Sequence, residues 1–156
     1  IANLAFGILF GMLAGGTLGT GVAWLAIVLA GTLGNGLNAL LQDGAHASIG
    51  ASTAIFGALG LLSGHAQPAH AARWRTHVRR WAPVAAGAML LALFGMSGER
   101  TDIWAHITGF VSGAGAGLML ARVDPRRLRA PRVQALAGAA APALVALGWT
   151  VAILSG

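Results

Sequence analysis

Residues 50–57 read Gly-Ala-Ser-Thr-Ala-Ile-Phe-Gly, and they open an apolar segment that decides the fold. This segment, about 50 to 63, is too short to cross a bilayer comfortably, because a spanning helix needs about 20 apolar residues. A short helix must therefore start or stop below the membrane surface. Irregular backbone at that depth is tolerated only where protein buries it or where it lines a water-filled cavity. The sequence predicts a recess with Ser52 near its floor.

The composition indicates a polytopic membrane protein. Hydrophobic residues make up 56 % of the 156 residues, charged residues make up 9 %, and the mean hydropathy is +0.74. So little polar surface cannot cover a soluble globule of this size. The absence of cysteine excludes disulfides, thiolate metal sites and a cysteine nucleophile. Arginine used without any lysine, beside abundant Ala and Gly, suggests a bacterial genome rich in GC.

The positive charge is a topology signal. The net charge of +6 comes from arginine, which is concentrated in two short connections, 73–80 and 122–132. The positive-inside rule places such connections in the cytoplasm. We therefore expect a multi-pass protein of the bacterial inner membrane, in contact with the lipid bilayer, and no nucleic-acid partner.

Further apolar segments flank the short one and read as membrane helices: 1–14, 20–41, 81–97, 103–121 and 135–154. The expected fold is an all-α transmembrane helix bundle in one domain, residues 1–156, with about six membrane segments. If the spans alternate, the segments with Asn3, Ser52 and His106 all run inward from the outer side. Their three polar side chains then converge at one depth.

Ser52 and His106 are the candidates for a catalytic pair. A serine hydroxyl is a poor nucleophile until a base removes its proton, and a neutral imidazole within hydrogen-bond reach is the usual base. The other four histidines fall beside the cytoplasmic arginines or in the external loop 42–49. The backbone amides at the start of the Ser52 helix are unpaired by construction and can bind an oxyanion, and Asn3 can supply a further donor.

Small residues allow the two helices to approach. Gly109, Gly113 and Gly117 follow His106 along one helical face, and Gly57 lies on the Ser52 helix. We expect these two faces to meet.

Structural explanations compete with each assignment. Serine in a membrane helix more often packs and bonds to its own turn, and small residues four apart are common in helix bundles. Asparagines are more often interhelical links than oxyanion donors. Asp102, one turn before His106, could orient the imidazole, but a helix N-cap explains it sufficiently. The histidines lack a spacing that suits a metal, and we expect no metal or cofactor.

Two stretches resemble the motifs of a known family, the rhomboid intramembrane serine proteases. Residues 50–57 resemble the GxSG box of that family, and Ala-His-Ile-Thr-Gly at 105–109, with Gly113 four further on, resembles its AHxxGxxxG box. Ile-Ala-Asn at 1–3 resembles the end of its HxxxN element, whose histidine would precede this sequence. The chain departs from the pattern at Thr53, where the family usually has glycine.

The resemblance implies a rhomboid-like bundle, truncated at its N-terminus, in which 135–154 is an extra last helix. It implies a serine endopeptidase that hydrolyses peptide bonds in or near transmembrane segments of membrane proteins. Ser52 would attack, His106 would act as base and then acid, and Asn3 with the backbone around Gly50 and Ala51 would bind the oxyanion and substrate. The alternatives are an inactive rhomboid-like protein that binds membrane clients and a small transporter. All four acids lie in loops, which argues against a proton relay in the membrane.

Overall fold

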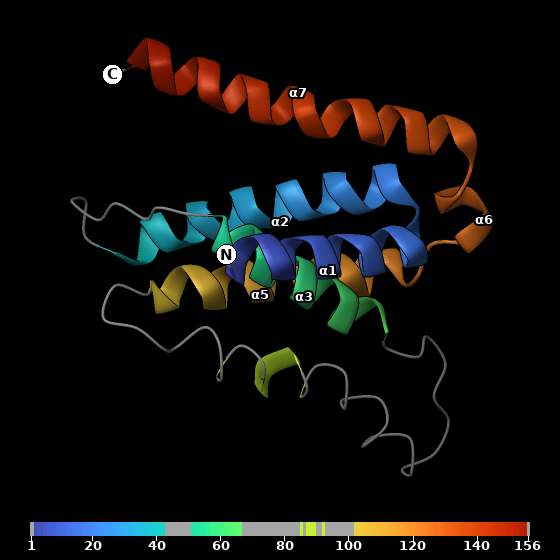
Figure 1. The fold of residues 1–156 in the computed structure, drawn as a ribbon, viewed down its shortest axis with the longest axis horizontal. Coiled ribbons are helices and arrows are strands. Elements are labelled where there is room, and N and C mark those ends of the chain that lie inside the picture. Colours follow the sequence, from blue (N-terminus) through green and yellow to red (C-terminus); the bar gives the residue numbers. More distant parts are fainter. Residues whose placement is uncertain are drawn as a thin grey trace.

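The computed structural model describes residues 2–42, 51–66, 85, 87–89, 92 and 102–155 (Figure 1). The helices there are α1 (Ala2–Leu18), α2 (Thr20–Leu41), α3 (Ser52–His65), α5 (Ile103–Leu120), α6 (Pro125–Leu128) and α7 (Pro131–Ser155). Three of them, α2, α5 and α7, are long and apolar enough to cross a membrane, and α1 is a shorter apolar helix. The expected all-α membrane bundle is confirmed. Most of the span expected at 81–97 lies outside the described residues.

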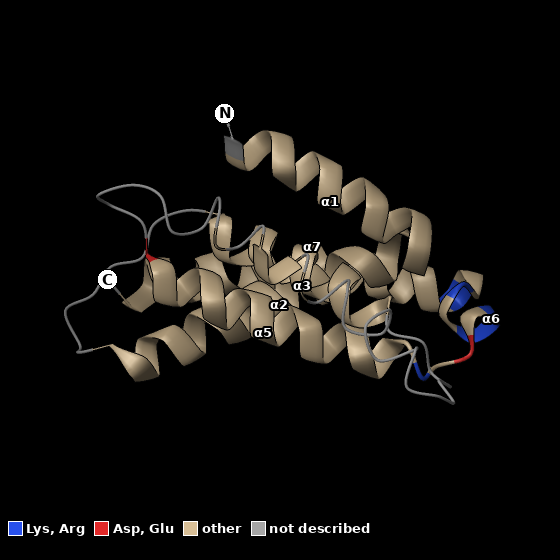
Figure 2. Cartoon of the chain, turned by 90° about the horizontal axis from the view of Figure 1, so that it is seen from below, with Lys and Arg blue, Asp and Glu red and all other residues tan. Residues whose placement is uncertain are grey.

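The helices run in two opposite directions. In Figure 1, α1, α3 and α5 run one way, whereas α2 and α7 run back. The described arginines gather around α6, at what we call the arginine end of the bundle (Figure 2). The first turns of α1, α3 and α5 therefore lie toward the opposite end, and these turns hold Asn3, Ser52 and His106.

Helix α3 is the centre of the bundle. Ten of its fourteen residues are buried, and it packs against α1, α2 and α5. Ala58 and the fully buried Leu61 join a core that includes Leu18, Val22 and Ala26. Between helices in lipid, association depends on close van der Waals packing rather than on expelling water, so small residues are favoured at the contacts. The Gly- and Ala-rich sequence of α3 suits this central position.

Helix α1 is longer than its sequence predicts. We expected it to end at residue 14, before Gly15 and Gly16, but it continues to Leu18. The turn is made by Gly19 alone, which has a φ of 86° that only glycine adopts readily. The amide of Gly19 still donates to the carbonyl of Gly15 at 2.9 Å. In an apolar environment a backbone without such bonds is costly, which overrides the low helix propensity of glycine.

The arginine-rich connection is also more ordered than expected. It contains α6, whose cap is Asp124; the Asp124 carboxylate accepts from the amide of Arg126 at 2.8 Å. Helix α7 begins at Pro131 rather than at residue 135, because proline in a first helical turn has no amide that needs a partner. Only Ala137 and Ala141 of α7 are buried.

Gln134 ties the start of α7 to the turn between α1 and α2. Its Oε1 accepts from the amides of Gly21 (2.8 Å) and Val22 (3.3 Å). Its Nε2 donates to the carbonyls of Leu18 (3.0 Å) and Leu128 (2.6 Å). One side chain thus satisfies groups at the end of α1, the start of α2 and the end of α6.

Candidate active site

Helices α3 and α5 pack as parallel helices with their backbones in contact. A Cβ atom at Gly109 would collide with the carbonyl oxygen of Thr53, and one at Gly113 with that of Gly57. One turn further, a Cβ atom at Gly117 would collide with the carbonyl oxygen of Leu61. Both helices advance by four residues from one contact to the next, so they run in the same direction in a fixed register. Only glycine at these positions permits that approach.

A second row of contacts includes His106. Its ring lies against the ring of Phe56, with 4.4 Å between centroids and 38° between planes. One turn along, a Cβ atom at Gly60 would collide with the carbonyl oxygen of Phe110. His106 is only 6 % exposed. The imidazole is therefore packed between the two helices and held at the level of Phe56.

Ser52 is the first residue of α3 and is partly buried. It precedes Phe56 by one turn, a separation of about 6 Å along the helix axis. Ser52 thus lies on the same row as Phe56, and the offset that pairs Phe56 with His106 puts Ser52 at the level of Asp102, one turn before His106. The first backbone bond of the helix is donated by Ile55 to Ala51, at 3.1 Å. The amides before Ile55 are the ones that a helix leaves without helical partners.

Thr53 occupies a space left by two glycines. It is 2 % exposed, and a Cβ atom at either Gly34 or Gly109 would lie 3.0 Å from its methyl carbon. A Cβ atom at Gly34 would also lie 2.7 Å from the Cα atom of Gly109. The residue that departs from the rhomboid pattern is therefore accommodated by glycine on α2 and on α5.

Asp102 holds the start of α5. Its Oδ1 accepts from the amide of Ala105 at 3.0 Å, which confirms the expected N-cap. Its Oδ2 accepts from Nδ2 of Asn38 at 2.8 Å, and Oδ1 accepts from Nε2 of Gln42 at 3.2 Å. The last turns of α2 are thereby fixed to the turn that carries His106.

Asn38 is an interhelical link, as expected of an asparagine here, whereas the bond from Gln42 was not predicted from the sequence. Gln42 also donates to Oδ1 of Asn38 at 3.1 Å, and Asn38 is buried. The available signal was their spacing of four residues, which puts two amides on one face at the end of an otherwise apolar helix.

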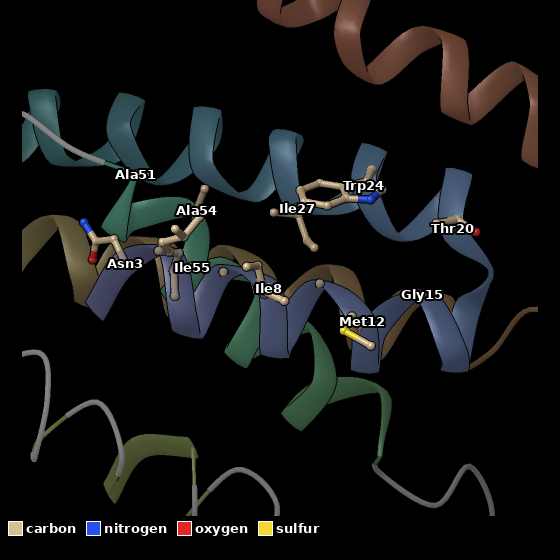
Figure 3. A pocket seen from close by; sticks show the side chains of 14 residues that line it. Asn3, Ile8, Met12, Gly15, Thr20, Trp24, Ile27, Ala51, Ala54 and Ile55 are labelled. Carbon is tan, nitrogen blue, oxygen red and sulfur yellow. The ribbon is translucent and has the colours of Figure 1, made fainter. Parts of the chain in front are cut away.

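Asn3 lines a cavity of about 560 Å³ between α1, α2 and α3. Figure 3 shows Asn3 and Ala51 at one end of this cavity and Thr20 at the other. Ala54, two residues after Ser52, also lines it, while Ser52 is not among the lining residues. Asn3 therefore shares a cavity with the residues that flank Ser52.

Some of the expected features fall outside the described residues. Gly50 is one of them, and most of the loop 42–49 is another, so the recess above Ser52 remains a prediction. Among the residues that the structure describes, no three His, Cys, Asp or Glu side chains are grouped as a metal site.

The Rhomboid domain family model matches residues 1–123, from the start of α1 to just beyond α5. Helices α6 and α7 follow the matched region. No curated protein and no solved structure matches the chain. The match covers most of the sequence and includes both glycine-rich boxes. The chain is an integral membrane protein that belongs to the rhomboid family.

Proposed function

We propose that this chain is the membrane core of a serine endopeptidase that cuts peptide bonds in or beside the transmembrane segments of other membrane proteins. The family includes serine proteases and also inactive members, so the assignment depends on the residues of this chain. The observation that supports it is the register of α3 and α5. Along that register, Ser52 lies one helical turn before the level at which His106 packs on Phe56, so the two side chains are within one turn of each other.

The proposed chemistry needs one proton carrier. As Oγ of Ser52 attacks the carbonyl carbon of the scissile bond, His106 accepts its proton. The resulting imidazolium then donates that proton to the leaving amine nitrogen, and an acyl-enzyme remains on Ser52. In the second half a water molecule attacks, His106 accepts one of its protons, and that proton returns to Ser52 as the new carboxylic acid leaves and then ionises in water.

The oxyanion donors in this proposal come from two helices. The first amides of α3 precede its helical hydrogen bonds, and they are the positive end of that helix. Asn3 approaches from α1 across the shared cavity. Removing one such donor typically lowers kcat by about 100- to 1,000-fold.

Cleavage of a model transmembrane substrate in lipid vesicles tests the proposal. We expect the full-length protein to cut it, and we expect Ser52→Ala and His106→Ala each to reduce the rate to background, because the two residues act as a unit. Ser63→Ala is the matched control; this buried serine on the same helix bonds to the carbonyl of Leu59. Activity above a few per cent in either of the first two variants would rule out the dyad. A folded wild-type protein that binds the substrate without cutting it would instead identify an inactive member that binds clients.

A further inference from the structure

A continuous groove follows the seam between α2 and α7. Its longer part is a hollow of about 690 Å³ with apolar walls that include Trp24, Val28, Pro142 and Val145. A second hollow, of about 400 Å³, lies toward the arginine end, and the residues that line it include Arg129 and Gln134. The two hollows share three lining residues, Thr20, Gly21 and Gly138, so they adjoin.

We propose that this groove binds one anionic phospholipid from the leaflet on the arginine side. The phosphate lies at Arg129 in the smaller hollow, and an acyl chain follows the seam past Trp24 toward Val28. The proposal does not depend on peptide-bond cleavage, because no residue of the proposed dyad takes part.

Arg129 is positioned to receive a phosphate. Its Nη2 donates to the carbonyls of Gly16 (2.6 Å) and Thr17 (3.0 Å) at the end of α1, which fixes the guanidinium beside the groove. A guanidinium has five N–H donors, and these bonds use only one of its nitrogens. Within the described part of the chain, Nε and Nη1 have no hydrogen-bond partner. They are free to form a charge-assisted pair with a phosphate.

Charge favours an anionic lipid over a zwitterionic one. Five exposed arginines gather at this end of the bundle, at 122, 126, 127, 129 and 132, with Asp124 as the one acid among the described residues there (Figure 2). Basic pockets between membrane helices are a recognised kind of site for anionic headgroups.

The shape of the seam favours an acyl chain. From Thr20 to Val28 it extends about 12 Å along α2, at 1.5 Å per residue. The helices come closest at its arginine end, where a Cβ atom at Gly21 would collide with the carbonyl oxygen of Gln134. Beyond Pro142, no described residue of α7 is buried. The groove is thus polar at the membrane surface and apolar within the membrane, as a phospholipid is.

Quenching of Trp24 by brominated lipids tests the proposal. A full-length variant with Trp24 as its sole tryptophan is placed in phosphatidylcholine nanodiscs that contain a small fraction of brominated phosphatidylglycerol or of brominated phosphatidylcholine. We expect stronger quenching by the anionic lipid at equal fractions. Trp24 also borders the cavity beside α1, but no arginine lines that cavity, so lipid there should quench equally in both cases.

Variants separate a site from general surface attraction. Arg129→Gln should weaken the apparent affinity for the anionic lipid about fivefold, the effect of one well-placed positive charge. Arg127→Gln removes the same charge from α6 away from the groove, and it should change the affinity less than twofold. Arg129→Lys keeps the charge and should retain the preference.

A second variant probes the apolar end. Ala146→Phe should fill the seam and reduce the quenching by the anionic lipid, whereas Ala152→Phe, on the exposed last turns of α7, should not. If Arg129→Gln does not fold, the comparison of Ala146→Phe with Ala152→Phe tests by itself whether the groove binds the anionic lipid. Equal quenching by the two lipids, an equal loss in Arg127→Gln, or no effect of Ala146→Phe would overturn the proposal.

Discussion

The ring of His106 packs on the ring of Phe56 at 4.4 Å between centroids, and Phe56 follows Ser52 by one helical turn. The proposed base is therefore positioned by the same helix that carries the proposed nucleophile. An aromatic surface one turn below the hydroxyl limits the orientations open to the imidazole.

Phe56→Leu should lower the cleavage rate while the protein stays folded. Leucine keeps most of the volume but removes the flat surface against which His106 packs, and small misplacement of a catalytic group can cost about 100-fold in rate. We expect a loss of about 10- to 100-fold in kcat. Phe110→Leu is the control, because it makes the same change at another aromatic ring of the same apolar cluster. Equal losses in the two variants would show that general packing, rather than the orientation of His106, is affected.

Gly109→Ala should destabilise the protein, and Gly115→Ala on the same helix should not. A Cβ atom at Gly109 collides with the backbone of Thr53, which cannot move away without shifting α3, whereas nothing lies within 4 Å of a Cβ atom at Gly115. Overpacking of this kind costs about 1–3 kcal/mol in the free energy of unfolding. Reversible denaturation in mixed micelles measures it. A Gly109→Ala protein as stable and active as the Gly115→Ala protein would contradict the contact between α3 and α5.

Asn38→Asp should make stability depend on pH. The new carboxylate would lie beside that of Asp102, and two ionised carboxylates at hydrogen-bond distance repel each other. When one of them takes a proton, the hydrogen bond between the two side chains is restored. We expect the variant to lose thermal stability relative to wild type at pH 8 and to recover much of it at pH 5. Asn35→Asp, on an exposed position of the same helix, should show no such recovery.

Gln134→Ala should loosen the turn between α1 and α2. It removes three hydrogen bonds to this turn and one to the end of α6, and we expect a loss of about 2 kcal/mol in the free energy of unfolding. Gln134→Glu keeps the acceptor for Gly21 and Val22 but loses the two Nε2 bonds, so its loss should be smaller. A Gln134→Ala variant with the same free energy of unfolding as the wild type would show that these bonds do not hold α7 to the bundle.

The sequence predicts the helices better than it predicts their ends and contacts. It places α2 at the observed bounds because Gly19 precedes a long apolar run, and it identifies Asp102 as a cap from position alone. It fails at Gly15 and Gly16, since local propensity ends a helix that the apolar environment continues. The spacing of Gly109 and Gly113 marks a contact face, but the backbone atoms that they meet depend on tertiary packing. The bonds from Asn38 and Gln42 to Asp102 join residues about 60 positions apart, which no local pattern encodes.

Covalent labelling with a fluorophosphonate tests the central claim most directly. The reagent phosphonylates a serine whose hydroxyl a base activates, and peptide mass spectrometry identifies the modified residue. For the folded full-length protein the account predicts one adduct, on Ser52, that forms at least about 100-fold more slowly in His106→Ala, the scale of general-base catalysis. No adduct on the folded protein, or an adduct on Ser52 that forms as fast without His106, would contradict it.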